Sequence, residues 1–129
     1  MANIIELIDS FLPQDIVPIY YLSLPQNTTG MLIEETGIVG EIHSFKGYDG
    51  VISSIIQFYS VIDPKDKKYT EMTAILRGFY KKVQEKVGAK KENIKLLYVG
   101  SFNMTPNLRD DANNYVFSLT FPIIYKESE

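Results

Sequence analysis

Large apolar residues occupy every second position between Asn114 and Tyr125. Successive side chains of a strand point to opposite faces, so this pattern predicts a long strand covered on one face. Pro122 predicts a bulge or an edge position late in the strand, because proline has no donor for the ladder. One face carries Tyr115, Phe117, Leu119, Phe121, Ile123 and Tyr125.

A second pattern, with helical spacing, lies between Tyr69 and Val87. Its apolar positions recur every three or four residues, which predicts an amphipathic helix with one buried stripe. Asp63 and Pro64 favour a helix start, and Gly88 favours its end. A shorter helix is predicted near Asn3–Leu12, before Pro13. The stripe consists of Tyr69, Met72, Ile75, Leu76, Phe79, Tyr80, Val83 and Val87.

Further strands are predicted at Ile16–Leu24, Met31–Gly37, Val51–Ile62 and Ile94–Phe102. Both faces of Val51–Ile62 are apolar, which suits a central strand covered on both sides. Gly40–Gly50 reads as a loop or a hairpin tip, since its glycines favour turns. The sequence therefore predicts an α+β fold: a mostly antiparallel sheet, a short N-terminal helix and one long helix packed on the sheet. With 129 residues, we expect a single domain spanning residues 1–129.

Composition excludes several classes of protein. Apolar residues make up 45% of the chain and charged residues 22%, which is near the globular average. The chain has no Cys, so disulfides and thiolate metal sites are excluded. The acidic N-terminus lacks the basic region of a signal peptide. No apolar run approaches the ~20 residues that span a bilayer, so no membrane partner is expected.

Charge is unevenly distributed along the chain. Residues 1–64 have a net charge of −7, residues 65–95 of +6 and residues 96–129 of −2. A basic region can be a solvated helix face, a surface for another protein or a nucleic-acid-binding face. The aromatic residues of the basic helix fall on its predicted buried stripe, so no exposed stacking residue is expected near it. A solvated face is the favoured interpretation.

The motifs of common enzymes and cofactor sites are missing. There is no phosphate-binding glycine loop, dinucleotide fingerprint or zinc-protease motif. His43 is the single histidine, and no nucleophile elbow accompanies it. Asp110 and Asp111 could form part of a divalent-ion site, but Asp and Asn in such a run more often stabilise a turn. We therefore expect no catalytic residues, no metal and no cofactor.

The layout resembles the tail terminator and related minor capsid (neck) proteins of long-tailed bacteriophages. Three segments carry the resemblance: "MLIEETG" (31–37), "GVISSIIQFYSVID" (50–63) and "GSFNMTPNLRDDANNYVFSLTFPIIYK" (100–126). In that group, a polar turn commonly precedes a final aliphatic and aromatic strand that ends in Tyr. The resemblance covers most of the chain.

The resemblance implies a structural subunit without catalytic residues that forms a ring, typically a hexamer. Such a ring caps the tail tube, stops its polymerisation and joins the tube to the head–tail connector. DNA would pass through the lumen without specific binding, and the protein would reside in the virion after assembly in the host cytoplasm. The residues expected at an interface are Phe45, Lys46, Tyr48, Asp49, Arg109, Asp110 and Asp111.

Three other functions stay open. The protein could be another neck, tail completion or minor capsid protein. It could instead be a small nucleic-acid-binding module that uses the basic region 65–95. An unrecognised small enzyme is the least favoured.

Overall fold

The computed structural model describes residues 3–13, 19–20, 30–42, 51–62, 69–109 and 115–127. Within these ranges the chain forms one seven-stranded sheet and two helices. The helices are α1 (Ile4–Asp9) and α2 (Tyr69–Glu85). The strands are β1 (Ile19–Tyr20), β2 (Gly30–Ile42), β3 (Val51–Ile62), β4 (Lys90–Lys91), β5 (Ile94–Val99), β6 (Asn103–Arg109) and β7 (Tyr115–Glu127).

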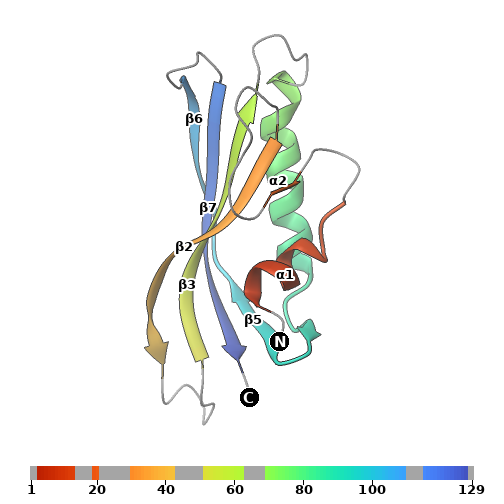
Figure 1. The fold of residues 1–129 in the computed structure, drawn as a ribbon, viewed down its shortest axis with the longest axis vertical. Coiled ribbons are helices and arrows are strands. Elements are labelled where there is room, and N and C mark those ends of the chain that lie inside the picture. The colour runs from red at the N-terminus through yellow and green to blue at the C-terminus, as the bar shows by residue number, and fades with distance from the viewer. Residues whose placement is uncertain are drawn as a thin grey trace.

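Three long strands, β2, β3 and β7, form the middle of the sheet. The strand order is β1-β2-β3-β7-β5-β4, with β6 also paired to β7. β3 pairs antiparallel with β2 on one side and with β7 on the other. The short β1 is parallel to β2. Figure 1 shows α1 and α2 on the same side of this sheet.

The predicted α+β class is wrong, because strands predominate over helices. The structure is mostly β, at 56% strand and 26% helix, and its sheet curls into a half-barrel. The prediction underestimated the strands in two places. β2 continues to Ile42 through a segment read as loop, and β6 occupies a stretch read as a turn.

β7 is paired along both of its edges, and the second edge is shared by two strands. β5 pairs with residues 123–127 of β7, and β6 pairs with residues 115–120. The break between β5 and β6 falls at Pro122, whose carbonyl accepts a hydrogen bond of 2.8 Å from the Gly100 amide. In an antiparallel strand, the nitrogen and the carbonyl of one residue point toward the same neighbouring strand. The nitrogen of Pro122, which has no hydrogen to donate, therefore points into the break between β5 and β6, where no ladder hydrogen bond is lost. Pro122 thus lies in a central strand, not at a sheet edge.

The hydrophobic core lies between the helices and the inner face of the sheet. Phe58 is in edge-to-face contact with Phe79 of α2 and with Phe121 of β7, at centroid distances of 6.5 and 5.3 Å. Such contacts stabilise beyond the apolar area that they bury. The helical stripe is confirmed as buried at Met72, Leu76, Phe79, Tyr80 and Val83. Val87 lies beyond the helix and is 46% exposed, so it was wrongly included.

The shorter helix and the central strand agree with the prediction in part. Asn3 caps α1, since its side chain accepts a hydrogen bond of 2.9 Å from the Glu6 amide. β3 is central, as expected, and Ile56, Phe58 and Ile62 of its inner face are buried. On the opposite, outer face Val51 and Val61 are also buried, whereas Ile55 and Tyr59 are only partly buried, so coverage of both faces is confirmed near the ends of the strand and is incomplete in its middle.

Candidate functional site

The interface residues expected from the sequence lie almost wholly outside the described part of the chain. Arg109 ends β6, and its backbone pairs with Tyr115 of β7. The other six, Phe45, Lys46, Tyr48, Asp49, Asp110 and Asp111, fall outside the described residues, as does His43. Their interface role stays a prediction.

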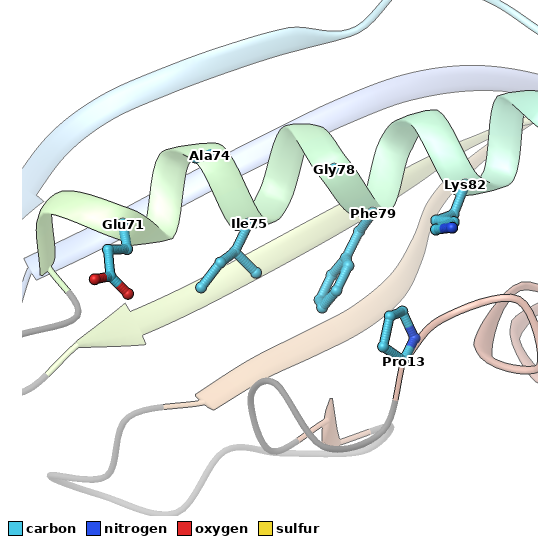
Figure 2. A pocket seen from close by; sticks show the side chains of 7 residues that line it. All are labelled: Pro13, Glu71, Ala74, Ile75, Gly78, Phe79 and Lys82. Atoms are coloured by element: carbon cyan, nitrogen blue, oxygen red, sulfur yellow. The ribbon is translucent and has the colours of Figure 1, made fainter.

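A groove of about 330 Å³ runs beside α2, and we call it the α2 groove. Its lining is almost wholly apolar. Figure 2 shows Phe79 pointing from the helix toward Pro13, which follows α1, and Ile75 extending from the same side of the helix. Glu71 marks one end of the row and Lys82 the other. The lining residues are Pro13, Glu71, Ala74, Ile75, Gly78, Phe79 and Lys82.

Gly78 is the unusual residue of the α2 groove. It lies in the interior of α2, where glycine destabilises a helix by roughly 0.5–1 kcal/mol relative to alanine. A Cβ atom added there would meet nothing within 4 Å, so no contact among the described residues requires its absence. Because Gly78 has no side chain, the helix backbone itself borders the α2 groove at this position. Gly78 was not among the residues expected to form a site, although a glycine inside a helical pattern is a visible signal in the sequence.

The arrangement of charges does not suit acid–base chemistry in the α2 groove. Glu71 and Lys82 are eleven residues apart on one helix, which separates their backbones by about 16 Å along its axis. Side chains so far apart cannot act together on one reacting bond, because proton transfer needs hydrogen-bond distance. Within the described ranges, no group of three or more His, Cys, Asp or Glu could hold a metal ion. Glu71 and Lys82 therefore do not form an acid–base pair in the α2 groove.

One buried polar pair joins β2 and β7 across β3. The Tyr125 hydroxyl donates a hydrogen bond of 2.8 Å to Oε2 of Glu35. Burial raises the pKa of Tyr125 well above its usual range, and the hydrogen bond and charge of Glu35 raise it further. The hydroxyl thus stays protonated at neutral pH and acts as a fixed donor between two strands that are not neighbours.

We expect alkaline pH to destabilise the fold through Tyr125. Its pKa is higher in the folded chain than in the unfolded chain, where it is about 10. The stabilisation is therefore complete below about pH 10 and is lost as pH rises above it, at up to about 1.4 kcal/mol per pH unit. Urea denaturation from neutral pH to about pH 11 measures this slope. Tyr125→Phe should flatten it, because the raised pKa is removed with the hydroxyl; equal slopes in the variant and the parent would contradict the assignment.

No family model matches the chain, and no curated protein matches it significantly. Neither helix of the described ranges is long and apolar enough to cross a membrane.

Proposed function

We propose that this protein is a virion structural protein of the tail terminator type. It forms a ring, typically a hexamer, that caps the tail tube, stops its polymerisation and joins it to the head–tail connector. Two considerations support the proposal: the sequence resemblance of three segments, and the α2 groove. Another neck or tail completion protein is the close alternative.

The α2 groove, open at Gly78, is the observation that carries the proposal. A ring needs a head-to-tail contact in which one surface of a subunit receives a different surface of its neighbour. An apolar groove with a small residue on the helix lets a neighbouring copy approach the backbone closely. The opposite charges of Glu71 and Lys82 at its ends would fix the orientation of that neighbour.

Filling the α2 groove should prevent assembly without unfolding the subunit. Gly78→Gln places a long side chain in open space, so the fold is expected to persist while the ring is lost. Gly78→Ala is the matched control: it should retain assembly and raise the free energy of unfolding by roughly 0.5–1 kcal/mol. Lys81→Gln, which is exposed and outside the groove, should behave as the parent.

Solution mass and electron microscopy test the proposal. Light scattering after size exclusion gives the subunit number, and negative staining shows rings, alone or on purified tail tubes. Exposed charge pairs are screened by salt, so the assembly should weaken at high ionic strength. A strict monomer at high concentration that also fails to bind tail tube protein would contradict the proposal. So would a Gly78→Gln protein that assembles like the parent.

A further inference from the structure

Three lysines lie in register across three neighbouring strands. Lys90 of β4 is opposite Lys95 of β5, and Lys95 is also opposite Lys126 of β7. Residues directly opposite in an antiparallel pair have Cβ atoms about 4.5–5.5 Å apart on the same face. The neighbours of Lys95, Ile94 and Leu96, are buried in the core, so the row stands on the outer face of the sheet. We call Lys90, Lys95 and Lys126 the lysine row.

The lysine row places like charges close together on one face of the sheet. Like charges placed directly opposite each other in a sheet are destabilising, and here two such pairs share Lys95. Lys90 and Lys95 are exposed, and the row lies at the end of the sheet away from β6. Such a concentration of positive charge attracts an anionic partner.

An irregularity in β5 brings an aromatic ring to the same face. Tyr98 and Lys95 are three residues apart, which would place them on opposite faces of a regular strand. The register shifts between Leu96 and Tyr98, so Tyr98 pairs with Ile124 while Lys95 pairs with Lys126. Ile124 and Lys126 are two residues apart and share a face, so Tyr98 shares the face of the lysine row. Tyr98 is 52% exposed there.

We propose that the lysine row and Tyr98 bind single-stranded nucleic acid. Lysines neutralise successive phosphates, and a base stacks on the exposed ring, the combination found in sequence-tolerant single-strand sites. An acidic protein would be attracted by the lysines but would gain less from an exposed aromatic ring. A duplex keeps its bases stacked on each other, so it cannot use Tyr98. The proposal does not rest on ring formation, because every residue of the site belongs to one subunit.

The sheet offers a closely matched pair of lysines for the test. Lys91 follows Lys90 in β4 but is opposite the buried Ile94, so it faces away from the lysine row. Lys95→Gln and Lys91→Gln therefore remove the same charge from neighbouring strands on opposite faces. A loss confined to Lys95→Gln would reflect position, since net charge changes equally in both.

Fluorescence anisotropy with a labelled oligothymidylate measures binding across a salt series. In about 50 mM salt, Lys95→Gln should weaken binding about five- to tenfold and reduce the slope of log K against log salt by about 0.7. Tyr98→Ala should weaken binding about tenfold and leave that slope unchanged, because stacking releases no counterions. Lys91→Gln should bind as the parent does. Thermal melts confirm that each variant is folded.

Several outcomes would overturn the proposal. They are the absence of binding at low salt, equal losses in Lys95→Gln and Lys91→Gln, and a slope unaffected by Lys95→Gln. Tighter binding of a duplex of equal length, or displacement of the oligonucleotide by polyglutamate at equal charge, would assign the row to another partner. Gly78→Gln, designed to prevent the ring, should bind the oligonucleotide like the parent. Loss of binding in that variant would show that the site does not lie within one subunit.

Discussion

Replacing Phe79 with alanine is expected to lower the free energy of unfolding by about 3–5 kcal/mol, as for other buried aromatic residues. Phe79 is 2% exposed and meets Phe58 of β3 edge to face. Its loss removes apolar burial and leaves a cavity at the point where α2 meets the inner face of the sheet. Since small domains are stable by about 5–15 kcal/mol, the variant should lose a large part of its stability.

Urea denaturation of Phe79→Ala and its parent gives this difference directly. The slope of free energy against urea should stay constant if the variant still unfolds in one step. Val87→Ala is the matched control, because Val87 is 46% exposed just beyond the same helix and should change stability by less than about 0.5 kcal/mol. A loss below about 1 kcal/mol for Phe79→Ala would mean that the space refills or that Phe79 is not in the core.

The second large effect is expected at Gly100, where β5 gives way to β6. A Cβ atom there would stand 2.6 Å from Cγ of Pro122, closer than two carbon atoms can approach. Neither side can move cheaply. The Gly100 amide donates to the Pro122 carbonyl, the Gly100 carbonyl accepts a hydrogen bond of 2.6 Å from Tyr80, and the proline ring is rigid. Gly100→Ala should therefore destabilise the fold by about 1–3 kcal/mol, the usual cost of overpacking.

A double-mutant cycle isolates the contact between Gly100 and Pro122. Pro122→Ala removes the ring that the new methyl group would strike. The double variant should therefore be more stable than the sum of the single losses predicts. Gly37→Ala is the control, because a Cβ at Gly37 meets nothing within 4 Å. Additive losses at positions 100 and 122 would show that the ring is not the obstacle.

Local patterns in the sequence located most elements but misjudged how much of the chain is strand. The apolar stripe of α2 and the alternation of β7 were visible because burial imposes a period on side chains. β6 was missed because Pro106 and Asn107 lie in it, at a register shift between Thr105 and Leu108 where these two residues stand opposite one residue of β7. With β6 read as a turn and β2 ended at Gly37, the fold class was assigned as α+β.

The candidate surfaces were harder to predict than the elements. Gly78 could have been noticed as a glycine inside a helical pattern. The open space beside it, however, depends on tertiary packing and is not visible in the sequence. The lysine row depends on register, since Lys90, Lys95 and Lys126 share a face only after β4, β5 and β7 are paired. The exposed Tyr98 contradicts the expectation that no stacking residue accompanies the basic region. That expectation was based on the aromatic residues of the helix, whereas Tyr98 lies on the sheet. A bulge in β5 places Tyr98 on the same face as the lysine row, and the pattern of alternating residues in the sequence does not show where such a bulge occurs.

The place of β7 in the sheet has a consequence for the order in which the protein can fold. β7 is paired with β3, β5 and β6, and it follows all three in the chain. During synthesis these strands emerge before the strand that joins them, so α1, α2 and the β2–β3 hairpin have no complete core to enclose. The β3–β7 ladder closes a long loop, and such non-local pairing slows folding. Assembly of the sheet must therefore wait for β7 to leave the ribosome, and until then the free edge of β3 is available to other chains.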